Sequence, residues 1–209
     1  MLTLYYSPGS ANMVVHLTLL ELGLAHTLER VDLDAGQQRS AAYLALNPNG
    51  VVPTLVIDGV PHGEAAALTM LLTERHAEAG LAPAADSSAR AEFLQWMFYL
   101  ANTLQPLFRQ WFYPGDYLPA AADSIKEAAR IGIEAAWSHV NNRLAAHGPY
   151  LLGTAFSAAD LYLLMLMRWS RNMPNPATTW ANLSSLADKL KARPSWRQLC
   201  DAEGLVEWA

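Results

Sequence analysis

The fold of this chain is decided by one stretch, Asn47-Pro48-Asn49-Gly50-Val51-Val52-Pro53-Thr54-Leu55-Val56-Ile57-Asp58-Gly59. Its prolines, glycines and asparagines form turns, and they lead the chain into a short β-branched run that is typical of a strand. Pro53 therefore stands at the start of a strand, where a ladder hydrogen bond is already missing. A cis Val52–Pro53 bond would turn the N–H and C=O of Val52 outward, free to pair with an extended ligand. A trans bond in an ordinary turn is the alternative, and these residues alone favour it.

The first 80 residues alternate between strand and helix patterns. Strands are predicted at Leu2–Tyr6, Thr27–Val31, Thr54–Ile57 and Val60–His62, and helices at about 12–23, 42–46 and 65–77. The first helix has Ser10 as its expected N-cap and Gly23 as its stop, and it is long enough to connect two parallel strands. Asp58-Gly59 predicts a hairpin, and Pro61 fits the following strand only at a sheet edge. The pattern predicts an α/β domain with a mixed four-stranded sheet.

The sequence changes character after Gly80. Residues 81–86 have the composition of a linker, and only helical periods follow them. Helices are predicted at Ser88–Phe112, Ala122–Ala146, Ala158–Arg171, Leu183–Ala192 and Ser195–Asp201, the first of them bent at Pro106. Ser157 and Asp160 form a capping box at the start of one helix, a stabilising role. We therefore expect two domains, residues 1–80 and an all-helical domain at residues 87–209.

Composition limits the possible partners. The 209 residues carry a net charge of −5 and no Lys/Arg cluster, which argues against nucleic acid. Apolar runs are too short for a membrane span, the histidines lack metal-ligand spacing, and Ser7-Pro8-Gly9-Ser10 lacks the dinucleotide-binding pattern. With the single Cys200 and a strand pattern at the N-terminus in place of a signal peptide, we expect a cytoplasmic protein without metal or nucleotide.

In their order and spacing, the motifs of the whole chain resemble the cytosolic glutathione S-transferases, specifically bacterial members without a catalytic cysteine. The motifs are Tyr6-Ser7-Pro8-Gly9-Ser10, Glu21-Leu22-Gly23-Leu24, the stretch from Asn47 to Leu55, Asp58-Gly59, Gly63-Glu64-Ala65-Ala66-Ala67 and Ser157-x-x-Asp160. The resemblance implies a thioredoxin-like first domain, a helical second domain, a homodimer, and glutathione as co-substrate.

The resemblance also implies a glutathione-binding set. The Val52–Pro53 bond would be cis, and Val52 would pair its backbone with the cysteinyl part of glutathione. Glu64-Ala65 would hold the γ-glutamyl end at a helix N-terminus, although the family places serine where this chain has Ala65, a difference that could cost about tenfold to a hundredfold in affinity. Gln38 or Arg39 would meet the glycyl carboxylate; alternatively, Arg39 is only a solvated surface charge.

Catalysis in this family needs a thiolate, stabilised near the end of the first strand or the start of the first helix. Bacterial relatives that begin with Tyr-x-Pro-Gly-Ala-Cys have a cysteine that this chain lacks. The remaining candidates are Ser10, Asn12, Ser7 and Tyr6. Ser10 is favoured, because a hydroxyl can donate its own proton to a thiolate, and the amide of Asn12 could help. As an alternative, Ser10 serves only as an N-cap.

For the hydrophobic substrate, the family builds a pocket from the first long helix of the second domain and its neighbours. The expected lining residues are Phe98, Asn102, Gln105, Trp111, Tyr113 and Arg168. The expected activity is conjugation of glutathione to small hydrophobic electrophiles. A glutathione-dependent isomerase or peroxidase, or a non-catalytic binding or regulatory protein of the same fold, are the alternatives.

Overall fold

The computed structural model describes residues 1–206 and 208, which form two compact units. The first unit consists of residues 1–82 together with the described residues from 191 onward, and the second consists of residues 83–190. The C-terminal helix α9 (Pro194–Glu203) thus groups with the first unit, where it packs against helix α1 (Asn12–Glu21). The sequence predicts α9 as part of the helical domain at residues 87–209. The helical period of a segment does not show which other elements that segment packs against.

A mixed four-stranded sheet forms the centre of the first unit. Its strands are β1 (Leu2–Tyr6), β2 (Thr27–Arg30), β3 (Thr54–Ile57) and β4 (Val60–His62), in the order β2-β1-β3-β4. β1 and β2 run parallel, whereas β3 pairs antiparallel with both β1 and β4. β4 lies at the edge, which accommodates Pro61, and the β3–β4 turn has positive φ angles at Asp58 and Gly59. The predicted thioredoxin-like sheet is confirmed.

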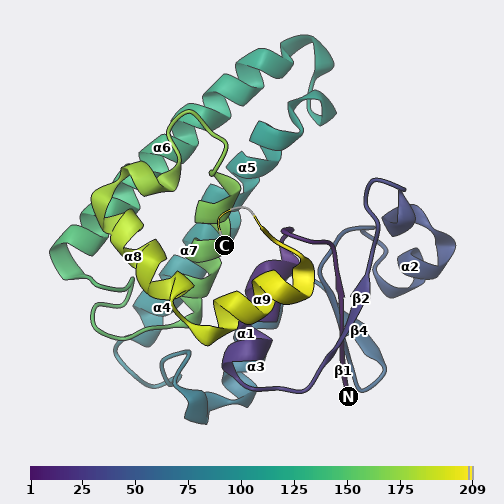
Figure 1. The fold of residues 1–209 in the computed structure, drawn as a ribbon, viewed down its shortest axis with the longest axis horizontal. Coiled ribbons are helices and arrows are strands. Elements are labelled where there is room, and N and C mark those ends of the chain that lie inside the picture. The colour runs from purple at the N-terminus through teal and green to yellow at the C-terminus, as the bar shows by residue number, and fades with distance from the viewer. Residues whose placement is uncertain (207, 209) are drawn as a thin grey trace. The chain divides into compact units, whose positions relative to one another are not determined.

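Helices cover both faces of this sheet (Figure 1). α1 and α3 (Ala65–Arg75) pack together on one side, over the fully buried Leu4 and Leu55. The short α2 (Ala41–Leu46) lies on the other side, where the Tyr43 and Tyr5 rings pack edge to face with their centroids 5.9 Å apart. Gly23 follows α1 with φ +63°, as expected for a residue that ends a helix.

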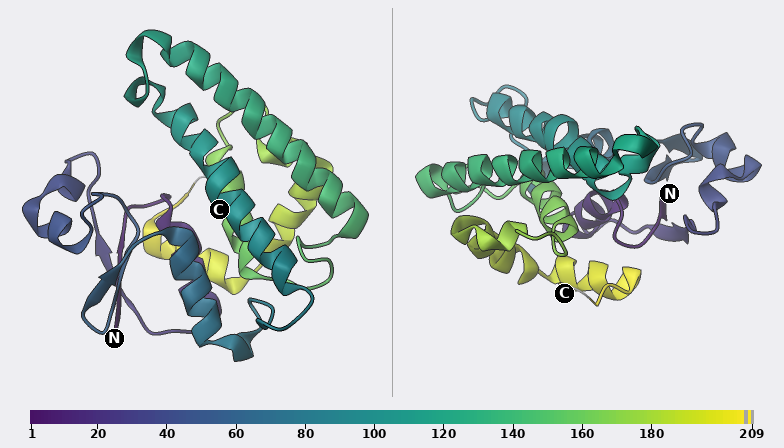
Figure 2. Two further views of the ribbon diagram at one scale, coloured as in Figure 1. Left: turned by 180° about the vertical axis from the view of Figure 1, so that it is seen from behind. Right: turned by 90° about the horizontal axis from the view of Figure 1, so that it is seen from above.

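The second unit is helical throughout its regular elements. It contains α4 (Arg90–Tyr99), the π-helical segment η3 (Leu100–Leu104), α5 (Gln105–Phe112), α6 (Ala122–His147), α7 (Ala158–Trp169) and α8 (Ala181–Lys191). The long α6 runs alongside α5 (Figure 2), and Phe108 packs against Trp137 between them. The helix predicted at Ser88–Phe112, with a bend at Pro106, is divided by η3, which ends two residues before that proline. Proline cannot donate to the preceding turn, and the wider π turn accommodates the missing bond.

Short 3₁₀ turns complete the chain: η1 (Gln37–Arg39), η2 (Ala77–Ala79), η4 (Pro114–Asp116), η5 (Pro119–Ala121) and η6 (Ala177–Thr179). Within residues 1–206 and 208, no helix is both long and apolar enough to cross a bilayer. The same residues contain no cluster of metal-ligating side chains.

One predicted cap is wrong. Helix α1 has Ala11 at its N-cap position, in helical backbone conformation, and it lacks a side-chain cap. Ser10 lies one residue earlier, where its backbone carbonyl accepts from the Met13 N–H at 3.1 Å. The tight turn Ser7–Ser10 starts the helix from its backbone, so the Ser10 hydroxyl is not used as a cap.

The capping box at α7 is confirmed. The buried Asp160 carboxylate accepts from the Ser157 N–H and the Leu151 N–H, both at 2.9 Å, and from the Ser157 hydroxyl at 3.2 Å. Burial outweighs these three donors and raises the pKa of Asp160 from 3.8 to about 6.

This raised pKa predicts a pH-dependent stability. Between about pH 4 and 6 the folded chain keeps a proton on Asp160 that the unfolded chain has released, so this group makes the unfolding free energy fall as pH rises. We expect the gap in unfolding free energy between wild type and Asp160→Asn to be about 2 kcal/mol larger at pH 4.5 than at pH 7. Urea unfolding at both pH values measures this gap, and an unchanged gap would contradict the assignment.

Candidate functional site

Strand register brings four segments of the first unit to one edge of its sheet. Tyr5 pairs with Thr54, so the loop that follows β1 lies beside the start of β3. Leu55 pairs with His62, which places the residues after β4 at this edge as well. The last residue of β2, Arg30, pairs with Tyr6, so the loop after β2 also begins here. The loops after β1 and β2, the start of β3 and the residues after β4 therefore lie near one another, although they are distant in sequence.

Val52 presents an unpaired backbone at this edge. The Val52–Pro53 bond is cis, as the family resemblance predicted. Within the described residues, neither the N–H nor the C=O of Val52 has a hydrogen-bond partner. Unpaired strand-like groups of this kind can pair with an extended ligand backbone.

Glu64 occupies the N-cap position of α3, and Ala65 is the first residue of that helix. Glu64 has φ +67° and ψ 103°, a conformation that non-glycine residues rarely adopt and that is found at ligand clamps. Its side chain is exposed and makes no capping bond, so the free N–H groups of the first turn are not covered by it. The helix terminus and the adjacent carboxylate can thus receive a ligand carrying both an ammonium and a carboxylate group.

Gln38 and Arg39 lie in η1, close to the turn that precedes Val52. The Gln38 side-chain N–H₂ faces the Leu33 carbonyl at 3.4 Å, and its Oε1 is buried without a partner in the described structure. Arg39 is exposed, and its guanidinium donates to the Asn49 carbonyl at 3.3 Å. Gln38 therefore offers an acceptor to a ligand, whereas Arg39 offers a positive charge.

Ser10 and Asn12 are in different environments. The Ser10 side chain is partly exposed and makes no hydrogen bond to any described residue. Asn12 is fully buried, where its Oδ1 accepts from the Ser7 N–H at 3.0 Å and its Nδ2 donates to Glu203 at 2.9 Å. Of these two residues, only Ser10 is partly exposed and has a side-chain donor that no described residue accepts.

Glu203 is a buried residue of this region that no sequence pattern predicts. From α9, its carboxylate accepts from the Gly9 N–H and from the Asn12 amide, and it contacts His16 Nδ1, each at 2.9 Å. Its side chain and that of His16 are both buried. Glu203 therefore holds the loop carrying Ser10 against helix α9, and a separation of 191 residues from Asn12 left no local sequence signal.

The predicted pocket residues all lie in the second unit. Phe98, Asn102 and Gln105 follow one another at helical spacing through η3, and Gln105 accepts a hydrogen bond from Tyr162 of α7. Phe98 and Tyr113 are about half exposed. The other two predicted pocket residues are Trp111 and Arg168.

Trp111 lies under the Lys126 ammonium, 4.6 Å from the ring centroid, and Arg168 is buried within α7. Phe98, Asn102 and Gln105 thus lie on the consecutive segments α4, η3 and α5, whereas Trp111 faces Lys126 of α6.

Comparisons with known proteins identify the family of this fold. The family model for the N-terminal domain of glutathione S-transferase matches residues 12–75. The solved ternary complex of BphK, a bacterial glutathione S-transferase, is 32% identical, with a TM-score of 0.87 and coverage of 97% of this chain and 100% of that one. A glutathione transferase homologue from Sulfitobacter, solved with bound glutathione, is 27% identical with a TM-score of 0.90, and the match covers 97% and 98% of the two chains.

Two curated relatives extend over nearly the full chain. Glutathione S-transferase GstA of Escherichia coli O157:H7 is 28% identical over 97% of this chain and 98% of its own. The disulfide-bond oxidoreductase YfcG of Escherichia coli K12 is 25% identical over 95% and 94%. The chain belongs to the glutathione S-transferase family, and one of the two curated relatives is named a disulfide-bond oxidoreductase.

Proposed function

We propose that this protein binds glutathione at the sheet edge of its first unit and conjugates the thiolate to small hydrophobic electrophiles. The observation that carries the proposal is the unpaired backbone of Val52, at the sheet edge that also holds the loop carrying the partly exposed Ser10 and the residues leading into α3. The glutathione bound to the Sulfitobacter homologue supports the ligand. The family resemblance further suggests a cytoplasmic homodimer.

Each part of glutathione has a proposed partner. Val52 pairs with the cysteinyl backbone, and Pro53 fixes the chain direction after it. Glu64 pairs with the γ-glutamyl ammonium, and the Ala65 N–H receives the neighbouring carboxylate at the start of α3. For the glycyl carboxylate we propose Arg39, since the unpaired Oε1 of Gln38 is an acceptor and would repel an anion.

The proposed reaction begins with loss of the glutathione proton to solvent. The Ser10 hydroxyl donates a hydrogen bond to the resulting thiolate and keeps its own proton. This hydrogen bond stabilises the thiolate and so lowers the pKa of the bound thiol. The sulfur then forms a bond to the electrophilic carbon, and the bond to the leaving group breaks with its electron pair. Asn12 is buried against Glu203, so we propose that it holds the Ser10 loop in place and does not touch the sulfur. Phe98, Asn102 and Gln105 remain our proposal for the electrophile surface.

Ser10→Ala tests the thiol activator. We expect the pKa of the bound thiol to rise by about one unit and kcat/KM at neutral pH to fall by about tenfold, because one hydrogen bond to a charged sulfur is lost. Thiolate absorbance in the complex, followed against pH, measures the pKa. Ser7→Ala and Tyr6→Phe are matched controls that remove neighbouring hydroxyls and should leave the thiol pKa unchanged. A shift in either control in place of Ser10→Ala would reassign the activator.

Calorimetric titration with glutathione separates conjugation from the other possibilities. Absence of binding at millimolar glutathione would exclude every glutathione-dependent activity and favour a non-catalytic role. Binding with an unshifted thiol pKa would overturn the catalytic proposal while leaving the binding site intact. Turnover of an aryl halide, an isomerisable substrate and an organic hydroperoxide would then distinguish transferase, isomerase and peroxidase.

Disulfide reduction is a second possible activity, favoured by the similarity to YfcG. A bound glutathione thiolate would attack a disulfide, forming a mixed disulfide and releasing one thiolate. A second glutathione would then release the other thiol and leave oxidised glutathione. The only cysteine, Cys200, is buried, so both sulfur atoms of the oxidised product would come from glutathione. Assay with hydroxyethyl disulfide, including the Cys200→Ser variant, tests this activity.

A further inference from the structure

A small polar cluster is buried directly beneath the Val51–Val52 backbone. It consists of Tyr43 on α2, Asn47 after that helix, and Thr54 at the start of β3. Their residue exposures are 4%, 6% and 0%, and Tyr43 itself belongs to an apolar cluster with Val31 and Val52. Buried polar side chains cost free energy unless each is hydrogen-bonded, so these three residues need an explanation.

The hydrogen bonds of this cluster follow from its donors and acceptors. Asn47 Nδ2 lies 2.8 Å from the Val51 carbonyl and 3.1 Å from Thr54 Oγ1, which uses both of its hydrogens. Tyr43 donates its hydroxyl to the same Val51 carbonyl at 2.8 Å. The remaining 2.9 Å contact joins Tyr43 to Thr54, so the Thr54 hydroxyl donates to the Tyr43 oxygen. Each side-chain hydrogen of the network is therefore donated to one acceptor.

Two donors on the Val51 carbonyl fix the direction of the next N–H. The carbonyl of Val51 and the N–H of Val52 belong to one planar peptide unit, and this unit is trans. In a trans peptide the C=O and N–H vectors point in opposite directions. Because Tyr43 and Asn47 draw the carbonyl inward, the Val52 N–H must point away from the cluster, where no described residue pairs with it.

We propose that Tyr43 and Asn47 are positioning residues that aim the Val52 N–H at the cysteinyl carbonyl of glutathione. The inference rests on the proposed function, which supplies the ligand, and adds the residues that orient its backbone contact. Burial raises the pKa of the Tyr43 phenol, so the hydroxyl stays neutral and keeps its hydrogen for Val51.

A merely structural role would use fewer of these contacts. The turn after α2 is already closed by the Asn47 Oδ1, which accepts from the Asn49 N–H at 3.1 Å, and by the Gly50 N–H, which donates to the Asn47 carbonyl at 2.9 Å. Both Nδ2 hydrogens and the Tyr43 hydroxyl are additional to this turn. One Nδ2 hydrogen and the Tyr43 hydroxyl both go to the Val51 carbonyl, which determines the direction of the Val52 N–H, and the other Nδ2 hydrogen goes to Thr54.

The test compares two ligands that differ at the cysteinyl carbonyl. γ-Glutamylcysteine ethylamide keeps this carbonyl, and γ-glutamylcysteamine lacks it. By calorimetry we expect wild type to prefer the ethylamide by about three- to tenfold, the effect of one oriented hydrogen bond. In Tyr43→Phe, which keeps the ring, the preference should shrink to less than about twofold. Asn47→Asp keeps the turn acceptor, removes both donors and should give the same loss.

Tyr5→Phe is the matched control, since Tyr5 contacts Tyr43 edge to ring and its hydroxyl is outside the network. It should retain the wild-type preference at similar thermal stability. If wild type prefers the ethylamide and Tyr43→Phe keeps that preference, the inference is overturned and the proposed function stands. If wild type binds both ligands equally, the inference fails together with the proposed contact between Val52 and the cysteinyl carbonyl, whereas glutathione binding is still supported by the titration itself and the proposal of conjugation stands. If wild type binds neither ligand nor glutathione, the proposed function falls and the inference with it.

Discussion

Replacement of Glu64 by alanine is expected to weaken glutathione binding by about 10- to 100-fold. The exposed Glu64 carboxylate stands at the N-terminus of α3, where it can pair with the γ-glutamyl ammonium while the helix N–H groups receive the adjacent carboxylate. A hydrogen bond to a charged group contributes about 1.5–3 kcal/mol, which corresponds to this loss of affinity. Calorimetric titration of wild type and variant measures it directly.

Glu64→Gly adds a readout that is independent of the ligand. At φ +67° a side chain is strained, and glycine removes that strain at some cost in chain entropy. We therefore expect the glycine variant to lose affinity like the alanine variant, yet to be more stable than it by roughly 1 kcal/mol in urea unfolding. Such a result would show that backbone strain is retained here for ligand binding. Unchanged glutathione affinity in both variants would remove Glu64 from the site.

The prediction of the sheet from sequence succeeded because its signals are local. Asp58-Gly59 specifies a hairpin through its positive φ angles, and Pro61 requires an edge strand, so the order of β3 and β4 follows from a few neighbouring residues. The position of the candidate site then follows from register, since the loops at one sheet edge must lie together. By contrast, the cis bond before Pro53 was predicted only through the family resemblance.

The supporting residues of the site could not be predicted from the sequence. Their hydrogen-bond partners are either far away along the chain or are backbone atoms, which carry no residue-type signal. Glu203 contacts Gly9, 194 residues away, and its helical period resembles that of any amphipathic segment. Tyr43 and Asn47 read as an ordinary helix end, and nothing in their spacing shows that both donate to one carbonyl. Ser10 illustrates the opposite error, since serine before a helix predicts a cap that the Ser7–Ser10 turn makes unnecessary.

Glu203→Ala is expected to lower the unfolding free energy by about 3–5 kcal/mol. The substitution removes the acceptor for the Gly9 N–H and the Asn12 amide and the partner of His16 Nδ1, leaving buried polar groups without compensation. The loss should also reach catalysis, because Gly9 and Asn12 flank Ser10. In the fraction that remains folded, we expect a raised pKa of the bound thiol, measured by thiolate absorbance.

The chain offers a matched control on the same two helices. Glu21 near the end of α1 accepts from Arg193 Nε and Nη2, both at 2.7 Å, and from the Ser195 hydroxyl. Glu21→Ala therefore weakens the contact between α1 and the start of α9, about three helical turns from the Ser10 loop. It should lower stability without changing the thiol pKa.

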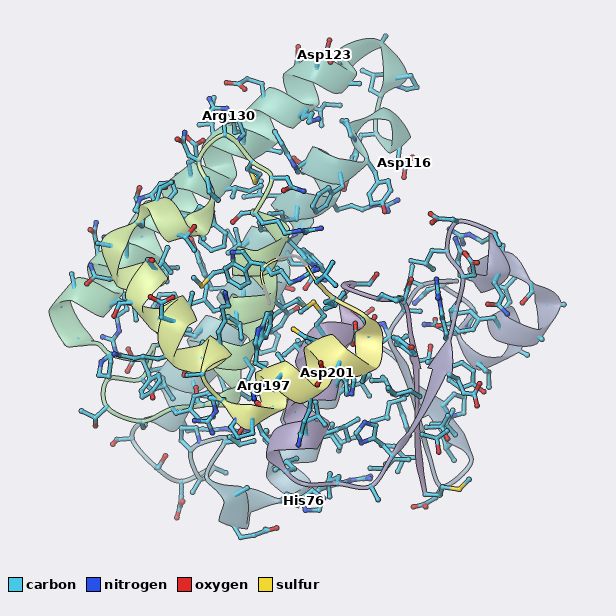
Figure 3. All side chains as sticks on the ribbon, viewed as in Figure 1. His76, Asp116, Asp123, Arg130, Arg197 and Asp201 are labelled. Atoms are coloured by element: carbon cyan, nitrogen blue, oxygen red, sulfur yellow. The ribbon has the colours of Figure 1, made fainter. Side chains whose placement is uncertain are left out.

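α9 turns its other face outward, where Arg197 and Asp201 are exposed (Figure 3), so Asp201→Ala should change neither property. If Glu21→Ala shifted the thiol pKa as much as Glu203→Ala does, helix docking in general would control the site. A shift confined to Glu203→Ala would instead assign the effect to the three contacts that Glu203 makes. Those contacts extend from α9 to the loop of the proposed activator, so the C-terminal helix would then be part of the thiol site and not only of the fold.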